Sequence, residues 1–225
     1  MNLRTMKISF TDNRIGQGDI PKMRGYISHT FPQYTELHHH LEGDKLLYQY
    51  PHIQYKVLSN IPMVIGIDSG VEVLKSIYDK IDEFKIGCEI QIIFEKQIIV
   101  RNEEFVVSDK TKGYTFLTPW LALNQENYNK WNTLSNHEKQ ERLNRILIGN
   151  ILSMAKGLRY VVTEEIKAEM DVRPVLTKLK GVPMVGFLGR FCVNFAIPDY
   201  LGLGKSVSRG FGTIKKGSFV FRLQS

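Results

Sequence analysis

A strand–helix–strand pattern that occurs twice along the 225-residue chain limits its possible folds more than any other feature. In the first half, apolar alternation and uninterrupted apolar runs predict strands. These strands are at 3–10, 48–57 and 61–67. Asp19-Ile20-Pro21 predicts the start of a helix that ends by Phe31, and Ser69 with Glu72 predicts a capping box for a second helix through Ile81. The apolar stretch 89–107 predicts a hairpin that turns near Arg101-Asn102.

The second half repeats this order. Its first strand is predicted at 114–123, and Ser135 with Glu138 predicts the capping box of a helix. The apolar face of that helix is predicted to consist of Leu143, Ile146, Leu147, Leu152 and Met154. Two long strands then flank Gly181, at 160–179 and 182–197, and a last strand is predicted at 213–223.

This order is the split βαβ pattern, so the predicted fold class is α+β with two tandem ferredoxin-like (RRM-like) domains and a C-terminal glycine-rich loop. The chain is long enough for two such domains, each with its own core. A short polar link at 109–113 separates them, which gives predicted domains of 1–110 and 111–225. The first carries a histidine cluster, and the second carries the glycine-rich loop and a basic surface.

Positive charge is concentrated in the second half of the chain. Residues 1–112 hold 14 Lys/Arg and 15 Asp/Glu, whereas residues 113–225 hold 16 and 8. From Arg173 onward, nine basic residues are opposed only by Asp199. Such a block predicts a polyanionic partner, the alternative being a solvated basic face.

Several other classes of protein are disfavoured. No apolar run approaches the roughly 20 residues of a membrane helix, and the N-terminus lacks the apolar core of a signal peptide. Cys88 and Cys192 are predicted to be small core residues rather than a disulfide or a metal site. We therefore expect a cytoplasmic protein without contact to a membrane.

A glycine-rich segment, Leu201–Gly212, lies within the basic block. Gly204-Lys205-Ser206 resembles the end of a phosphate-binding P-loop, but Asp199 stands where its first glycine is required. Glycines allow backbone N–H groups to approach a phosphate, and nearby cations add attraction. The residues predicted to bind the phosphates of a polyanion are Gly202, Gly204, Lys205, Ser206, Arg209, Gly210 and Lys215. The alternative is a flexible turn between two elements.

The pattern Gly-x-Gly-x(5)-Gly-Phe-Gly, followed by a basic strand, resembles the glycine-rich loop of the CRISPR-associated RNA-binding superfamily. Within that group the chain is similar to the Cas-six endoribonucleases, in its length, its two ferredoxin-like halves and its early histidines. The resemblance implies cleavage of CRISPR repeat RNA, with the 2′-hydroxyl of the RNA as nucleophile. The implied products are a 2′,3′-cyclic phosphate and a 5′-hydroxyl, and no metal or other cofactor is expected.

Three consecutive histidines, His38, His39 and His40, provide candidate catalytic groups. In an extended segment His38 and His40 share one side, and His39 faces away. Two imidazoles suit a reaction that removes one proton and supplies another near neutral pH. A surface loop without a role remains an alternative, as does a zinc site of His38 and His40 with Glu36 or His52, although adjacent histidines rarely give a tetrahedral arrangement.

The resemblance also implies a lysine or tyrosine beside the histidines. Lys45 is the candidate to stabilise charge on the phosphate, and Tyr34 and Tyr48 flank the run. Two other functions compete with the endoribonuclease. One is a non-catalytic RNA-binding subunit of a CRISPR effector complex, and the other is a metal-dependent enzyme that uses Glu103-Glu104 or Glu164-Glu165. Expected partners are CRISPR repeat RNA, an effector complex and a second copy of the chain.

Overall fold

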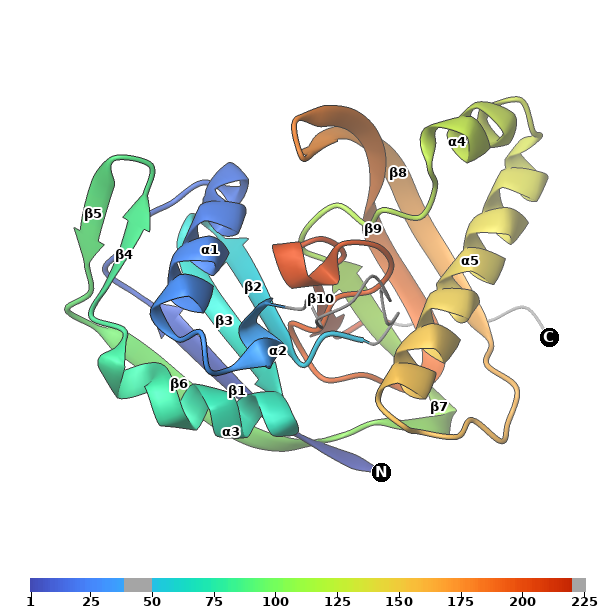
Figure 1. The fold of residues 1–225 in the computed structure, drawn as a ribbon. Coiled ribbons are helices and arrows are strands. Elements are labelled where there is room, and N and C mark those ends of the chain that lie inside the picture. The colour runs from blue at the N-terminus through green and yellow to red at the C-terminus, as the bar shows by residue number, and fades with distance from the viewer. Residues whose placement is uncertain (39–49, 220–225) are drawn as a thin grey trace. The chain divides into compact units, whose positions relative to one another are not determined.

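The computed structural model describes residues 1–38 and 50–219, and of His38 only the backbone (Figure 1). The chain divides into two compact units. The N-terminal unit contains residues 2–103 together with Ser208–Gly210, and the C-terminal unit contains Met1 and the rest of the described chain from Glu104. Within the described residues, every helix is too short or too polar to cross a membrane.

The N-terminal unit has the ferredoxin-like order of strands. Its sheet runs β2-β3-β1-β6, and helices occupy both crossovers, as expected for a split βαβ pattern. The strands are β1 (Asn2–Phe10), β2 (Ile53–Leu58), β3 (Ile61–Ile67) and β6 (Lys96–Glu104), and the crossover helices are α1 (Ile20–Thr30) and α3 (Ser69–Ile77). Short 3₁₀ turns precede α1 (η1, Gln17–Asp19) and follow α3 (η2, Tyr78–Lys80). The sequence-based fold class is confirmed for this unit.

Alternation along the strands places one apolar face against the helices. Tyr55 pairs with Val64, which in turn pairs with Ile8, so the three side chains lie on the same face of the sheet. This face packs against buried residues of α1 and α3, such as Met23 and Leu74, in one core. Figure 1 shows both helices on the same side of the sheet.

The predicted capping box at Ser69 and Glu72 is wrong. Asp68 is the residue before the helix, and its backbone has a positive φ of 46°. Its carboxylate accepts a hydrogen bond from the Arg4 backbone N–H across the sheet, at 3.0 Å. Ser69 is already helical, and its hydroxyl contacts His52 Nδ1 at 2.8 Å instead of capping the helix.

The hairpin between α3 and β6 lies earlier in the chain than the sequence analysis predicted. Strands β4 (Glu83–Ile86) and β5 (Glu89–Ile92) pair with each other and turn at Gly87 and Cys88, where Gly87 has a φ of 67°. The predicted turn at Arg101-Asn102 falls inside β6. Cys88 is exposed at the hairpin turn, so its prediction as a core residue is also wrong, whereas Cys192 is buried.

The C-terminal unit repeats the same strand order with one crossover changed. Its sheet runs β10-β7-β9-β8, and α5 connects the first strand to the second. The elements are β7 (Val106–Phe116), α4 (Gln125–Asn132), α5 (Asn136–Gly157), β8 (Ala168–Leu179), β9 (Val182–Ala196) and β10 (Ile214–Gly217). In the crossover between β9 and β10, which corresponds to the one that holds α3, the chain has the glycine-rich segment and a 3₁₀ turn, η3 (Val207–Arg209).

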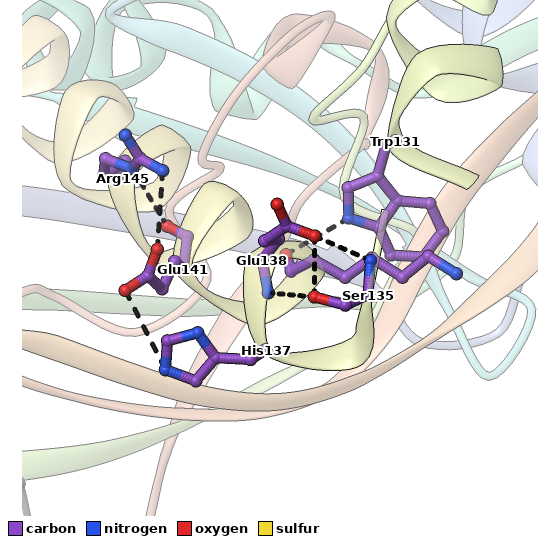
Figure 2. Close-up of polar contacts among 7 residues, drawn as sticks. Trp131, Ser135, His137, Glu138, Glu141 and Arg145 are labelled. Carbon is purple, nitrogen blue, oxygen red and sulfur yellow. Dashed lines mark hydrogen bonds and ion pairs between the residues drawn. The ribbon is translucent and has the colours of Figure 1, made fainter. Parts of the chain in front are cut away.

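Helix α5 begins at the predicted capping box (Figure 2). The Ser135 backbone N–H donates to the Glu138 carboxylate at 2.9 Å, and the Glu138 N–H donates to the Ser135 hydroxyl at 3.4 Å. Leu143, Leu147 and Met154 are buried as predicted. Leu152 is 44% exposed, because nine residues after Leu143 place it on the opposite side of the helix.

Candidate functional site

The histidine run starts at a fixed point of the N-terminal unit, the end of α2 (Thr35–His38). Leu37 is 1% exposed and packs in the core of this unit. Its carbonyl accepts a buried hydrogen bond of 2.9 Å from the Ser28 hydroxyl of α1. The backbone of His38 therefore follows directly from an anchored residue.

The predicted extended backbone is wrong at His38, which is the last residue of α2. Its position therefore gives no support to the alternation that paired His38 with His40. His39, His40 and Lys45 lie outside the described residues. Of the two neighbouring tyrosines, Tyr34 is partly buried against the core of the N-terminal unit, and Tyr48 lies outside the described residues.

The glycine-rich segment is folded back on itself. The Leu203 N–H donates to the Gly212 carbonyl at 2.9 Å, and the Ile214 N–H donates to the Leu201 carbonyl at 3.0 Å. The Gly212 N–H also donates to the Pro119 carbonyl at 2.9 Å. These bonds close the segment at its base, which differs from the flexible turn considered as its alternative.

Two of its glycines are required by close packing and backbone conformation. Gly212 has a φ of 61°, and a Cβ there would lie 2.0 Å from the Leu203 carbonyl oxygen. Gly204 has a φ of 84°, and a Cβ there would lie 2.7 Å from Trp120 Nε1. That indole nitrogen donates to Asn150 of α5 at 2.9 Å. The glycines thus give the loop its shape, and their predicted contact with RNA stays a prediction.

The cations of this region differ in how far they are fixed. Lys205 is exposed, and Arg209 is partly buried at the end of η3. Lys215, on β10, is exposed and places its Nζ 5.9 Å from the centre of the Tyr200 ring. Lys205 and Lys215 therefore present charge to solvent. Ser206 has a φ of 59° and is partly buried, so its hydroxyl sits in a constrained turn.

Further positive charge lies along β8 and its turn with β9. Arg173, Lys178 and Lys180 are exposed there. Arg190, on β9, stacks over the Phe219 ring with 5.1 Å between its guanidinium carbon and the ring centre. The basic block is thus largely a surface of exposed cations, as a polyanion-binding surface requires.

The carboxylate pairs of the metal-dependent alternative have structural surroundings. Glu103 accepts a hydrogen bond from the Thr5 hydroxyl at 3.1 Å, and Glu104 lies 3.8 Å from Lys112 Nζ. Glu164 and Glu165 are exposed outside regular structure. Within residues 1–38 and 50–219, no three His, Cys, Asp or Glu side chains gather in a group that could hold a metal ion. The zinc site with His38 and His40 falls largely outside these residues.

Two cations, one fully buried and one partly buried, were not identified by the sequence analysis. Lys56 of β2 is fully buried, and its Nζ donates to Gln54 Oε1 at 2.8 Å. Burial lowers the pKa of Lys56 to about 7. Arg24 of α1 is partly buried, and this burial lowers its pKa, with a smaller lowering by the positive charge of Arg209 and an opposing effect of Tyr55. Alternation along β2 places Lys56 on the face of the strand opposite its apolar side chains. No sequence pattern indicated that this second face is also buried.

The chain has two ferredoxin-like units in tandem, the second with a glycine-rich loop in place of its second helix, which is the arrangement expected from the resemblance to the CRISPR-associated RNA-binding superfamily. Residues 1–104 match the family model of the Cas6b N-terminal domain, and residues 106–217 match that of the Cas6b C-terminal domain. The chain therefore belongs to the Cas6b family.

Solved structures agree with this assignment. A crystal structure of Cas6b is 38% identical in sequence to this chain, and the match covers 96% of this chain and 100% of the Cas6b chain with a TM-score of 0.89. A crystal structure of the CRISPR RNA processing endoribonuclease Cas6b is 36% identical, with the same coverage of both chains and a TM-score of 0.78. An uncharacterized protein of Methanocaldococcus jannaschii is 42% identical over 135 residues, which are 60% of this chain and 92% of that protein.

Proposed function

We propose that this protein is an endoribonuclease that processes CRISPR RNA, and that it cleaves repeat RNA without a metal ion. The observation that carries the proposal is a run of three histidines directly after the anchored Leu37, in a chain of the Cas6b family. The family supports the activity, since a member 36% identical to this chain is titled as a CRISPR RNA processing endoribonuclease.

The proposed reaction uses the RNA itself as nucleophile. One histidine of the pair His38 and His40 removes the proton of the 2′-hydroxyl, whose oxygen attacks the adjacent phosphorus. The bond from phosphorus to the 5′-oxygen breaks, and the other histidine gives that oxygen a proton. Lys45 stabilises the negative charge that develops on the phosphate. The products are a 2′,3′-cyclic phosphate and a 5′-hydroxyl, and no water or electron is consumed.

RNA binding is assigned to the glycine-rich segment and β10. Lys205, Arg209 and Lys215 attract phosphates, while Gly202, Gly204, Ser206 and Gly210 shape the loop so that its backbone can approach them. The exposure of Lys205 and Lys215 supports this role. If each of these two cations neutralises one phosphate, Lys205→Ala and Lys215→Ala should each flatten the slope of log affinity against log salt by roughly 0.7.

Cleavage of repeat RNA in EDTA tests the reaction. The ends of the product should be a cyclic phosphate and a 5′-hydroxyl, and an RNA with a single 2′-deoxy nucleotide upstream of the cut should bind without being cut. Cleavage that stops in EDTA would favour the metal-dependent alternative. RNA that is bound tightly but left intact would instead favour a non-catalytic subunit of a CRISPR effector complex.

Alanine variants of the histidines test the choice of catalytic groups. Since His38 is helical, the alternation that selected His38 and His40 has no support at that residue, and the three single alanine variants decide which imidazoles act. His38→Ala and His40→Ala should each lower the single-turnover rate by roughly 10²–10⁴-fold with little loss of RNA affinity. His39→Ala is the matched control. A slow His39→Ala beside fast His38→Ala and His40→Ala would contradict the assignment.

A second copy of the chain and a CRISPR effector complex are further proposed partners. Light scattering of the purified protein, with and without repeat RNA, tests the dimer, because the mass of the complex gives the number of chains directly.

A further inference from the structure

Three residues of α1 follow one another at intervals of four, Ile20, Arg24 and Ser28. Residues four apart in a helix lie on the same face, one turn above the other. Arg24 therefore lies between Ile20 and Ser28 along this face. Ile20 and Ser28 each contact another segment of the N-terminal unit, and these contacts locate Arg24.

At the Ile20 end, Gly210 approaches the helix. Ser208–Gly210 belong to the same compact unit as α1 and β2. A Cβ on Gly210 would lie 2.6 Å from Ile20 Cδ1 and 3.2 Å from the Tyr55 carbonyl oxygen, and Gly210 has a φ of 84°. Only a glycine permits this approach, which brings the preceding residue, Arg209, to the helix face that carries Arg24.

At the Ser28 end lies the start of the histidine run. The Ser28 hydroxyl donates to the Leu37 carbonyl at 2.9 Å, and His38 follows Leu37 in the chain. Arg24 is thus one helical turn from Ser28, which bonds to Leu37, and one turn from Ile20, which packs against Gly210.

The two arginines affect each other electrostatically. Burial is the main cause that lowers the pKa of Arg24; the interaction with Tyr55 opposes it, and the positive charge of Arg209 lowers the pKa further. The planar guanidinium group suits two parallel hydrogen bonds to a phosphate, and an anion bound by both arginines would also reduce the repulsion between them.

We infer that Arg24 and Arg209 together bind one phosphate of the RNA, on the face of α1 between Ile20 and Ser28. Arg209 was already expected to contact RNA, whereas Arg24 is a new member of the site and the pairing gives both a shared ligand. The inference rests on the proposed function, because RNA is the source of the phosphate. Arg24 is then a binding and positioning residue, which holds the RNA backbone in place for cleavage.

RNA-binding measurements with Arg24→Gln, Arg209→Gln and the double variant test this pairing. Each single change should weaken binding of a repeat RNA about 10- to 100-fold, the effect of losing hydrogen bonds to a charged group. Because both side chains share one phosphate, the double variant should lose little more than either single variant. Arg24→Lys should recover only part of the affinity, since lysine keeps the charge but not the two parallel donors.

Lys22→Gln is the matched control. Lys22 lies on the same helix, is exposed and pairs with Asp19 at 2.9 Å, so its loss should leave RNA affinity nearly unchanged. A repeat RNA with a neutral methylphosphonate at the contacted position should bind the wild-type protein less tightly than unmodified RNA does. Arg24→Gln should bind the modified and the unmodified RNA with equal affinity. Inorganic phosphate should raise the melting temperature of the wild type more than that of either variant.

The outcomes separate this inference from the proposed function. Single variants with unchanged affinity, or a double variant whose loss is the product of the two single losses, would overturn the shared phosphate while leaving RNA cleavage intact. Shared loss in a protein that binds repeat RNA but never cuts it would support the arginine pair and contradict the endoribonuclease. If Arg24→Gln fails to fold, Arg209→Gln with the modified RNA gives the same test.

Discussion

The Ser28 hydroxyl donates a buried hydrogen bond of 2.9 Å to the carbonyl of Leu37, the residue before His38. This bond joins α1 to α2 and fixes the chain where the histidine run begins. A small polar side chain in the core therefore connects the stability of the N-terminal unit to the position of the proposed catalytic groups.

Ser28→Ala should slow RNA cleavage more than it weakens RNA binding. Loss of the hydroxyl leaves the Leu37 carbonyl without this donor, at a cost of about 1–3 kcal/mol in the free energy of unfolding. Single-turnover cleavage and RNA titration measure the two effects separately. Thr30→Ala is the matched control, because the Thr30 hydroxyl also donates at 2.9 Å to a backbone carbonyl, that of Tyr26 in its own helix, but is exposed. Equal rates in both variants would contradict the anchoring role.

Gly212→Ala should destabilise the C-terminal unit strongly. The added Cβ would meet the Leu203 carbonyl oxygen at 2.0 Å, and the backbone has a positive φ that alanine disfavours, so we expect a loss of several kcal/mol. Gly149→Ala, in the middle of α5, is the control. Open space surrounds its Cβ position, and alanine in a helix should stabilise by roughly 0.5–1 kcal/mol. Opposite shifts in the two midpoints of urea unfolding are the expected result.

The sequence predicted the fold well because both halves carry strong periodic signals. Alternation in β1 and the capping box of Ser135 placed their elements correctly. The Arg101-Asn102 turn was wrong because polar residues on an edge strand resemble a turn, and β6 is such an edge. Cys88 was predicted to lie in the core because it stands in an apolar stretch of sequence. That stretch forms a hairpin, and Cys88 is exposed at its turn.

The candidate site was less accessible to sequence reasoning, since it depends on contacts between distant residues. The glycine-rich segment stood out by composition, but only the structure shows Gly212 against Leu203. Arg24 sits in a helix without any motif, and its significance comes from Gly210, far along the chain, packing against Ile20. Local patterns contain no information about such pairs.

Ser135→Ala should destabilise α5 by about 1 kcal/mol at neutral pH, through loss of the capping box in Figure 2. The Ser135 hydroxyl, and next its backbone N–H, lower the pKa of Glu138. A lowered pKa means that this stabilisation is present above the unfolded pKa of the carboxyl and is lost as the pH falls through the folded value. The difference between wild type and variant should therefore shrink toward about pH 3.

Urea unfolding at both pH values measures this change. Ser153→Ala, at an exposed position inside the same helix, is the control and should stabilise slightly at either pH, because alanine has the higher helix propensity. A cost for Ser135→Ala that is the same at neutral and acidic pH would mean that the Glu138 half of the capping box contributes nothing.

Lys56→Met should raise the stability of the protein at and below neutral pH. Burial lowers the pKa of Lys56 from its ordinary value of 10.5 to about 7, so the folded state holds a buried charge that the unfolded state exposes to water. A gap of this size corresponds to roughly 5 kcal/mol at most. Loss of the hydrogen bond to Gln54 subtracts about 1 kcal/mol, and the net gain should be a few kcal/mol.

The pH dependence distinguishes this cause from better packing of methionine. Above the folded pKa of Lys56, the folded state has lost the proton that the unfolded state still binds, so the stability of the wild type rises as the pH goes from about 7 to about 10. The advantage of Lys56→Met should disappear over this window. Lys75→Met, at an exposed position, is the control for the exchange of lysine for methionine. An advantage that persists unchanged at high pH would show that packing, and not the buried charge, separates the two proteins.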